Sequence, residues 1–464
     1  MLFNSIDFLL FFPFVCIICW LIKEVQWRNI FLLTSSYYFY MNWEPIYAIL
    51  LLGCTFISYI ASFAIEKWPQ NKKIWLYLSI GSELLLLGLF KYADFISDNI
   101  QQLFYHLNIH MNVPHLSLLL PVGISFFIFQ SVGYIVDVYK GNVKAERNFI
   151  TYALFIAFFP QLVAGPIERS CNLFPQFKHI RIPNNKDFNQ GISWMLWGYF
   201  MKLVLADRCA LVADNILNDY ELFNGTSLFI ASLCFSFQIY GDFCGYSLIA
   251  IGAAKIMGFQ LMKNFNHPYL SISISDFWHR WHISLSSWFR DYLYIPLGGS
   301  YGNSLRTYRN LLITFLISGL WHGANWTFIL WGGLHGILLC LERRIGWNRK
   351  SVKGVKRAIH IVVTFLIVTF LWIIFRAPNI SQAFSIISAI FTDYGTPYSN
   401  QMADYAAIIA AISILFAKEL TDDSIWRKRL LSNKYVHSCT MAFLLAYIVL
   451  FGVLNGDQFI YFQF

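Results

Sequence analysis

The sequence predicts an all-α, multi-pass membrane protein of about ten to twelve transmembrane helices, and three observations lead to that prediction. Of the 464 residues, 57% are hydrophobic and only 13% are charged, about half the charged fraction of a soluble domain. The mean hydropathy is +0.53. Apolar runs close to the length of about 20 residues that a helix needs to cross a bilayer recur along the whole chain. These observations exclude a soluble enzyme and make the lipid bilayer the first partner of the chain.

The apolar runs follow one another without a Ser/Gly-rich linker or an internal repeat. They cover residues 6–22, 29–41, 45–65, 74–93, 117–139, 149–163, 190–206, 227–258, 310–341, 358–376, 403–417 and 437–454. We therefore expect one integral membrane domain over residues 1–464. Its polar motifs lie in a core at about 117–343, between peripheral helices at 1–93 and 358–454.

The first run is expected to remain in the protein as a membrane helix. It begins MLFNSIDFLLFFP, with no basic segment and no cleavage site of small residues, so it does not resemble a signal peptide. The closely spaced Cys16 and Cys19 lie inside this run, where cysteines pack far more often than they bind zinc or form disulfides. We assign neither metal nor disulfides.

Basic residues predict the sidedness of the runs. Lys23, Lys67 and Lys140 mark alternate loops, whereas the segment 94–115 contains no Lys or Arg. By the positive-inside rule both termini, including residues 457–464, are extracytoplasmic. Basic clusters at 343–357 and 418–434 should then face the cytoplasm. The formal net charge of +9 follows this topology and does not indicate a nucleic-acid partner.

Two runs have basic residues at both ends, which favours re-entrant segments. Residues 149–163 lead into FFPQLVAGP, whose prolines and glycine interrupt a helix. Residues 310–341 contain the stretch Gly319 to Gly323 as the expected turn. An arm from Asn310 to Gly319 would reach about 15 Å, half of the hydrocarbon thickness. This places His322 near the membrane midplane, in a cavity, because irregular backbone at that depth needs protein or water around it.

His322 is the first candidate for chemistry, since an ionisable side chain in an apolar run is costly. The alternative is a histidine that only bonds a neighbouring helix. His279 and His282 would share a helical face, and Asp276 is a nearby carboxylate, yet a zinc site needs a further ligand and is not predicted. The surrounding segment, Trp278 to Tyr294, also fits an interfacial helix.

Asp242 is a carboxylate within an apolar run and should be either paired or catalytic. Arg290 or Arg208 is the expected partner, and pairing is the simpler interpretation. Glu168, Arg169 and Lys202 supply further polar groups of the core, whereas His335 is expected to pack.

Five motifs in order resemble the membrane-bound O-acyltransferase family, in particular its bacterial branch typified by alginate O-acetylation. They are LPVGISFFIFQ at 120–130, FPQLVAGPIER at 159–169, FQIYGDFCGYS at 237–247, WHISLSSWFRDYLYIPLGG at 281–299 and SGLWHGANW at 318–326. The resemblance implies helices around a central tunnel. It matches the invariant histidine of the family to His322 and the second active-site histidine to His282. Supporting positions along the tunnel would be Asp242, Trp281, Arg290, Asp291, Tyr294, Trp321 and Asn325.

Two positions depart from the pattern of the alginate branch. Leu248 stands where that branch has an acidic residue and where the D-alanyl-transferring branch tends to be apolar, and His279 replaces an arginine. These differences leave the substrate open.

The resemblance implies acyl transfer, usually of acetyl, across a bacterial inner membrane. Acetyl-CoA or an acyl-carrier thioester would be the cytoplasmic donor, and no tightly bound cofactor is expected. The acceptor would be a cell-envelope polysaccharide, such as alginate, cellulose or peptidoglycan, or a partner protein outside the membrane. His322 would be a neutral general base worth about 10² to 10⁴ in rate.

His282 would orient the donor or stabilise an oxyanion, and basic residues such as Arg280, Arg306 and Arg309 would attract an anionic donor. The alternatives are transfer of D-alanyl or another acyl group, a transporter of a small acid or lipid-linked sugar, and a non-catalytic scaffold.

Overall fold

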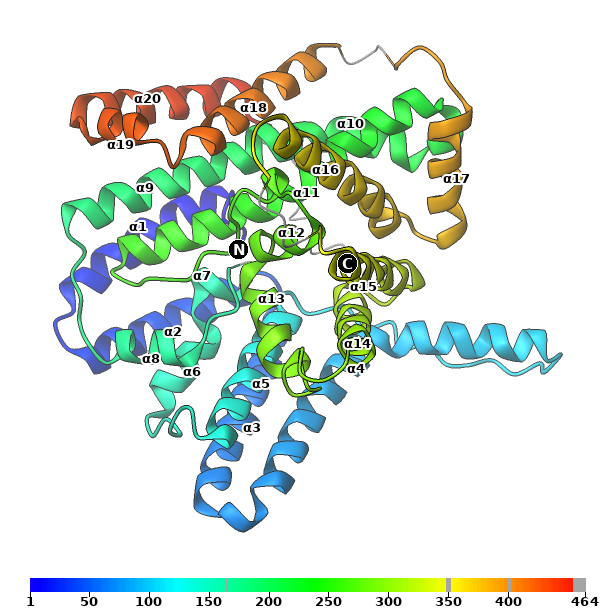
Figure 1. The fold of residues 1–464 in the computed structure, drawn as a ribbon. Helices are drawn as coiled ribbons and strands as arrows, with labels where there is room; N and C mark the ends of the chain where they lie inside the picture. The colour runs from blue at the N-terminus through cyan, green and yellow to red at the C-terminus, as the bar shows by residue number, and fades with distance from the viewer. Residues whose placement is uncertain (164, 348–351, 399–401, 454–464) are drawn as a thin grey trace.

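The computed structural model describes residues 1–163, 165–347, 352–398 and 402–453, and helices dominate them (Figure 1). The first half of the chain forms α1 (Ile6–Leu21), α2 (Val25–Met41), α3 (Tyr47–Lys67), η1 (Pro69–Asn71), α4 (Lys72–His106), α5 (Ile124–Lys140), α6 (Phe149–Ala157), α7 (Phe159–Leu162), α8 (Ser170–Phe177), α9 (Asn185–Tyr199) and the π-helical η2 (Phe200–Ala206).

The second half forms α10 (Asp207–Asn218), η3 (Tyr220–Leu222), α11 (Gly225–Ile256), η4 (Pro268–Leu270), α12 (Ile274–Arg280), α13 (Ile283–Phe289), the π-helical η5 (Arg290–Tyr294), α14 (Ser304–His322), α15 (Trp326–Ile345), α16 (Gly354–Arg376), α17 (Ile380–Thr392), α18 (Met402–Thr421), α19 (Ile425–Ser432) and α20 (Lys434–Phe451). No β-strand occurs among the described residues. The predicted all-α class is confirmed.

Within the described residues, five stretches of helix are long and apolar enough to cross a membrane: Tyr47–Lys67, Pro69–His106, Gly225–Ile256, Gly354–Arg376 and Lys434–Phe451. A helix has to present about 20 mostly apolar residues to span the hydrocarbon layer. Several of the other predicted runs are divided between two shorter helices, as residues 149–163 are between α6 and α7.

Asparagine side chains begin the helices that carry the candidate site. Asn224 caps α11, Asn303 caps α14 and Asn325 caps α15, each accepting a hydrogen bond from a backbone N–H of the first turn. Such caps satisfy amide groups that have no partner inside the helix. The polar residues between the apolar runs therefore define where these helices start.

Helix α11 lies at the centre of the fold because glycines let its neighbour approach closely. A Cβ atom at Gly198 of α9 would lie 2.7 Å from the Gly245 carbonyl oxygen, and one at Gly252 would lie 2.6 Å from the Gly191 carbonyl oxygen. Residues of α11 belong to both apolar cores of the molecule, one built mainly by α1 to α8 and one by α10 and α16 to α18. The two cores thus meet along this helix.

Helices α14 and α15 form a hairpin whose break differs from the predicted one. The helix continues through Gly319 and ends only at His322, and the turn comprises residues 323–325. The glycine at 319 serves packing instead, because a Cβ atom there would lie 2.2 Å from the Phe328 carbonyl oxygen. The turn was predicted over Gly319 to Gly323, and the structure places it at 323–325, so that of the predicted stretch only Gly323 lies in the turn. A glycine in a helix can mark close helix contact as well as a break.

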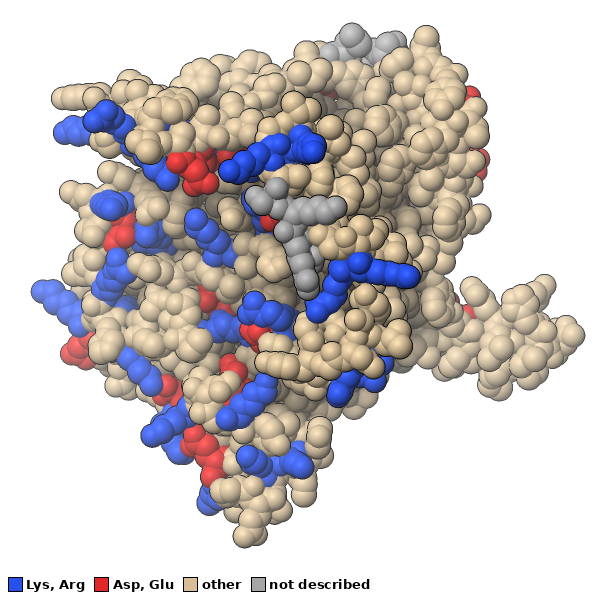
Figure 2. Space-filling view, viewed as in Figure 1, with Lys and Arg blue, Asp and Glu red and all other residues tan. Residues whose placement is uncertain are grey.

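The last part of α4 projects from the body of the molecule, and the chain returns beside it (Figure 1). Lys and Arg gather over the left and lower parts of the face in Figure 2, whereas the projecting segment shows none. This asymmetry matches the absence of Lys and Arg from residues 94–115. Arg349 and Lys350 of the predicted basic cluster, Ala164 and residues 457–464 lie outside the described residues.

Candidate active site

The structure brings His282 and His322 to the same aromatic ring. The Trp321 indole lies with its centroid 6.1 Å from that of the His282 imidazole and 4.9 Å from that of His322. Both histidines are buried, with 0% and 4% of their surfaces exposed. The two histidines are 40 positions apart in sequence, so the fold is what makes them neighbours of one indole.

His322 is the last residue of α14, and aromatic rings enclose its imidazole. Trp331 and Phe375 lie edge-on to it, with centroids at 5.1 and 5.4 Å. An imidazole enclosed by apolar rings is favoured in its neutral form, because burial disfavours the charged one. A neutral imidazole can accept a proton, which is what a general base requires.

His282 is oriented by a hydrogen-bond network centred on Asn264. The Asn264 Oδ1 atom lies 3.0 Å from His282 Nδ1 and 3.3 Å from the backbone nitrogen of Ser284. The Ser284 N–H can only donate, so the shared atom is an oxygen, and His282 Nδ1 has to carry the proton that it donates. Asn264 Nδ2 in turn donates to Ser247 Oγ at 3.1 Å. This leaves His282 Nε2 as a lone-pair acceptor.

Several buried polar atoms near the histidines have no hydrogen-bond partner within the described part of the chain. They are His282 Nε2, His335 Nε2 and the Nε1 atoms of Trp321, Trp331 and Trp372. Trp278 Nε1 donates to His335 Nδ1 at 3.2 Å, so the neutral His335 carries its own proton on Nε2. Unsatisfied buried groups are rare in proteins. Here they comprise one acceptor and four donors, which suits a ligand with carbonyl and hydroxyl oxygens.

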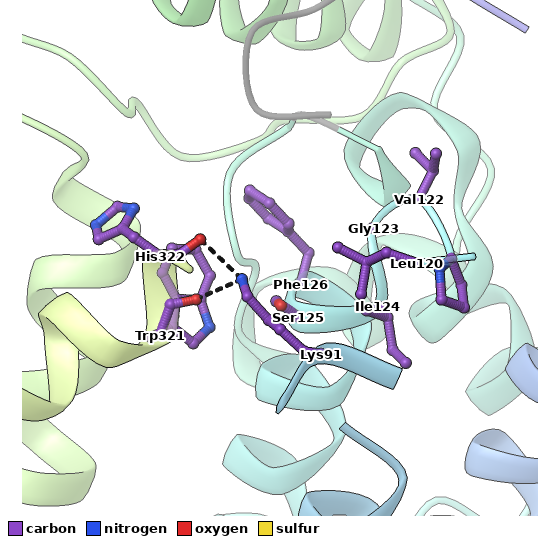
Figure 3. Close-up of a pocket in the computed structure, with 10 residues that line it drawn as sticks. Lys91, Leu120, Val122, Gly123, Ile124, Ser125, Phe126, Trp321 and His322 are labelled. Carbon is purple, nitrogen blue, oxygen red and sulfur yellow. Dashed lines mark hydrogen bonds between the residues drawn. The ribbon is translucent and has the colours of Figure 1, made fainter. Parts of the chain in front are cut away.

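A pocket of about 50 Å³ lies beside the end of α14. Lys91 of α4, Trp321, His322 and the turn at 120–126 line it (Figure 3). Lys91 Nζ donates to the carbonyl oxygens of Trp321 and His322, whereas the His322 imidazole points away from Lys91 (Figure 3). The pocket is thus next to His322 and bordered by the Lys91 amino group.

The predicted pairing of His279 with His282 on one helical face is wrong. Helix α12 ends at Arg280, Trp281 is extended and His282 adopts a left-handed conformation with φ of 43°. His279 instead bonds the Ser275 carbonyl oxygen at 2.6 Å. Among the described residues, no group of three or more His, Cys, Asp or Glu side chains is arranged to hold a metal ion.

Asp242 is paired, as expected, but with Lys202 and not with either predicted arginine. Lys202 Nζ lies 2.8 Å from Asp242 Oδ1 and 2.7 Å from Asp207 Oδ1, and all three side chains are buried. The wider π-helical turn η2 carries Lys202 between α10 and α11. The predicted partners bond elsewhere, Arg208 to Asp404 and Arg290 to Asp291.

The π-helical turn η5 carries Arg290, Asp291 and Tyr294. Their contacts belong to a second cluster of polar side chains. Asp291 forms an ion pair with Arg169 at 3.1 Å, and Tyr294 bonds Ser300. Burial raises the pKa of the neighbouring Glu168 to about 7. Among the described residues, the hydrogen bonds and ion pairs of these three side chains are made with residues other than His282 and His322.

Trp281 and Asn325 occupy supporting positions. The Trp281 ring is buried against Trp372, with centroids 5.1 Å apart, and Trp372 stacks on Trp331 at 5.5 Å. Trp281 therefore extends the aromatic wall of His322. Asn325 caps α15 and donates from Nδ2 to the Pro378 carbonyl oxygen at 2.8 Å.

Sequence reasoning missed Asn264 and Lys91. Asn264 lies in an irregular segment where asparagine is common, so its sequence context carries no signal. Lys91 did carry a signal, because a lysine at the end of the apolar run 74–93 needs a partner.

Comparison with known proteins places these residues in a family context. A sequence model described as the membrane-bound O-acyltransferase family matches residues 142–382. The chain is 41% identical over 402 residues to a probable alginate O-acetylase of Pseudomonas aeruginosa, covering 85% of this chain and 76% of that protein.

Two further relatives differ in the acceptor or acyl group that their names state. A peptidoglycan O-acetyltransferase of Helicobacter pylori is 36% identical over 397 residues, covering 79% of this chain and 74% of that protein. A teichoic acid D-alanyltransferase of Lacticaseibacillus rhamnosus is 27% identical over 341 residues, covering 65% of this chain and 80% of that protein.

Proposed function

The chain belongs to the membrane-bound O-acyltransferase family and is an acyltransferase of the membrane, and we propose that it transfers acetyl from a cytoplasmic thioester to a hydroxyl outside. The observation that carries this proposal is the pair of buried imidazoles, His282 and His322, that both contact the Trp321 ring. The relatives named as O-acetyltransferases support acetyl as the acyl group.

In the proposed reaction, His322 accepts the proton of the acceptor hydroxyl as the oxygen attacks the thioester carbonyl. A new C–O bond forms, and the carbonyl electron pair moves to the oxygen. When the tetrahedral intermediate collapses, the C–S bond breaks and the thiolate takes the proton from the His322 imidazolium. The aromatic enclosure of His322 supports this role, because it favours the neutral base at the start of each cycle.

His282 is proposed to orient the thioester donor, by accepting a hydrogen bond at Nε2 from an N–H or O–H group of that substrate. The Nδ1–H group of His282 donates to Asn264 Oδ1, so the Nε2 atom has a lone pair that can accept a hydrogen bond. Stabilising an oxyanion from Nε2 would first require protonation in an apolar site, which is costly. The unpartnered N–H groups of Trp321 and Trp331 are better suited to that task, since they are donors without charge.

The proposed architecture follows from the sequence and the positions of the charges. We infer about ten to twelve membrane passes, re-entrant segments at α6 to α7 and α14 to α15, and a central tunnel in which donor and acceptor meet. Residues 1–464 would form one domain, with the motif core at about 117–343. The basic face in Figure 2 would be cytoplasmic, with both termini outside a bacterial inner membrane.

The donor is proposed to be acetyl-CoA or a carrier thioester, bound as a substrate and not as a resident cofactor. The acceptor would be a polysaccharide such as alginate, cellulose or peptidoglycan, or a hydroxyl of a partner protein that passes the acetyl on. Transfer of D-alanyl is the second candidate, since Leu248 is apolar and a D-alanyltransferase is among the relatives.

The test uses membranes that contain the wild-type protein or the His322→Ala variant, incubated with radiolabelled acetyl-CoA. Label should enter a polysaccharide, protein or lipid fraction with the wild type and fall at least about a hundredfold with the variant. Equal transfer by both would overturn the role of His322. Label that appears only when a D-alanyl thioester replaces acetyl-CoA would favour the second candidate.

A further inference from the structure

The carboxyl end of α14, at His322, lacks the left-handed capping residue that commonly follows a helix. The last four carbonyl groups of an α-helix have no partner within the helix, and a left-handed residue after the helix commonly turns an N–H back toward them. Gly323 follows His322 in an extended conformation, with φ of −169° and ψ of 159°. The carbonyl groups at this end therefore need donors from elsewhere in the fold.

Two neighbouring side chains of α4 supply those donors. The Tyr92 hydroxyl donates to the Leu320 carbonyl oxygen at 2.7 Å. Lys91 Nζ donates to the carbonyl oxygens of Trp321 at 2.7 Å and of His322 at 2.8 Å (Figure 3). Three consecutive carbonyls of α14 are thus bonded to two adjacent residues of α4.

The Lys91 amino group complements the partial negative charge at the carboxyl end of α14. Among the described residues, no carboxylate forms an ion pair with Lys91, and its two hydrogen bonds go to backbone carbonyls. The carboxyl end of a helix carries partial negative charge, which an ammonium group stabilises. Lys91 also lies 5.8 Å from the centre of the Trp321 ring. The cation is therefore held by α14 itself.

The remainder of α14 is fixed by α15, so the contacts of α4 act on the last turn. A Cβ atom at Gly332 of α15 would lie 2.2 Å from the Phe315 carbonyl oxygen, and one at Gly319 would lie equally close to Phe328. Beyond Gly319 the helix carries only Leu320, Trp321 and His322. These are the residues whose carbonyls Lys91 and Tyr92 bind.

We propose that Lys91 and Tyr92 are positioning residues that hold the last turn of α14 and thereby place the His322 imidazole for proton transfer. This proposal rests on the proposed function for its effect on turnover, but not for its effect on the position of His322. Lys91 takes no part in the chemistry, because its ammonium group bonds the backbone while the imidazole points away from it (Figure 3).

The first measurement follows the protection of His322 and needs no substrate. Wild type, Lys91→Met, Lys91→Arg, Tyr92→Phe and Lys73→Met proteins in lipid nanodiscs are treated with diethyl pyrocarbonate, and modification is mapped by mass spectrometry. Exposed His110 reports the reagent concentration. Loss of the Lys91 hydrogen bonds should speed modification of His322 by about tenfold. Lys91→Arg should restore much of the protection, and Lys73→Met, which removes an exposed lysine of the same helix, should change nothing.

The second measurement is steady-state transfer from radiolabelled acetyl-CoA by the same proteins. Misplacement of a catalytic group by about 1 Å can cost 10²-fold in rate, so kcat should fall about tenfold to a hundredfold in Lys91→Met with little change in KM. The fall in kcat should be smaller in Tyr92→Phe than in Lys91→Met.

The outcomes separate the two proposals. If His322 in Lys91→Met remains as protected as in the wild type, the positioning role is overturned. If protection falls but no protein transfers label from acetyl-CoA or from an acetylated carrier protein supplied in its place, the proposed function fails and the positioning role stands. A fall in kcat that Lys91→Arg does not relieve, with protection unchanged, would also contradict the positioning role.

Discussion

His282 shows how a single residue depends on partners that the sequence does not reveal. Its left-handed backbone, with φ of 43°, is uncommon for any residue other than glycine. The motif identified the histidine but suggested a helical neighbour, His279, as its partner. The fold instead turns the chain between α12 and α13 and bonds the imidazole to Asn264. Which nitrogen carries the proton is set by that bond.

A substitution at Asn264 should therefore change the pH dependence of turnover. In Asn264→Asp, a carboxylate would face His282 Nδ1 and favour the protonated imidazole, so the acid limb of the rate–pH profile should move to higher pH by about one unit or more. Ser284→Ala removes a hydroxyl from the same network without removing the acceptor of Nδ1, and should leave the profile in place. Coincident profiles for the wild type and Asn264→Asp would show that the network does not control His282.

Among the helices, small residues determine which elements lie together. Gly319 was expected to begin the turn that extends to Gly323, yet it lies inside α14 and admits the backbone of α15. Glycines of α9 and α11 allow the same close approach. The sequence pattern of a glycine in an apolar run does not distinguish a turn from a contact. Only the neighbouring helix decides between them.

Gly319→Ala should separate α14 from α15. Its Cβ atom would lie 2.2 Å from the Phe328 carbonyl oxygen, so the helices have to move, at a cost of about 1–3 kcal/mol or more. The expected result is a lower melting temperature in detergent, measured by the fraction that remains monodisperse after heating. Gly88→Ala is the matched control, since nothing lies within 4 Å of the Cβ atom that it would add. A Gly319→Ala protein as stable as Gly88→Ala would contradict the close contact.

The ion cluster of Lys202 fixes η2 against α10 and α11. Lys202→Met would leave the carboxylates of Asp207 and Asp242 buried without their cation, at a cost of about 3–5 kcal/mol. Adding Asp207→Asn and Asp242→Asn to that variant should recover part of the stability, because the uncompensated charge is removed. Thermal stability of the solubilised protein measures both effects. Lys186→Met, which removes an exposed lysine of α9, is the control. If Lys202→Met lowers the thermal stability no more than Lys186→Met does, the cluster is not needed for stability.

At the scale of the whole molecule, charge asymmetry carries the proposed orientation. The face with clustered Lys and Arg would lie in the cytoplasm, and the projecting segment, which has neither, would lie outside (Figures 1 and 2). Such an orientation would bring an anionic thioester to the basic face and the acceptor hydroxyl to the opposite one.

The native Cys171 of α8 provides a test of that orientation. It is exposed and lies between Arg169 and Lys178, so a membrane-impermeant maleimide should label it in inverted vesicles and not in intact spheroplasts. A cysteine introduced by Asn112→Cys should show the opposite pattern. Labelling of Cys171 from outside would reverse the proposed topology.

The sequence by itself determined that this is an all-helical membrane protein of the O-acyltransferase family. Composition, the length of apolar runs and ordered motifs are properties of the chain that no contact has to supply. The same motifs identified His282 and His322, and the buried position of His322 was expected from its context. Sequence reasoning also found that Asp242 needs a partner, since an unpaired charge in an apolar run is costly.

Only the tertiary structure decided which groups meet. Lys91 and His322 are 231 residues apart, yet the Lys91 side chain donates a hydrogen bond to the His322 carbonyl oxygen. A π-helical turn selects Lys202 over two arginines as the partner of Asp242. Hydrogen bonds and ion pairs act over about 3 Å and depend on direction, so a small change in where a helix ends or widens exchanges one partner for another. Such details arise from the packing of the helices and leave little trace in the hydrophobic pattern.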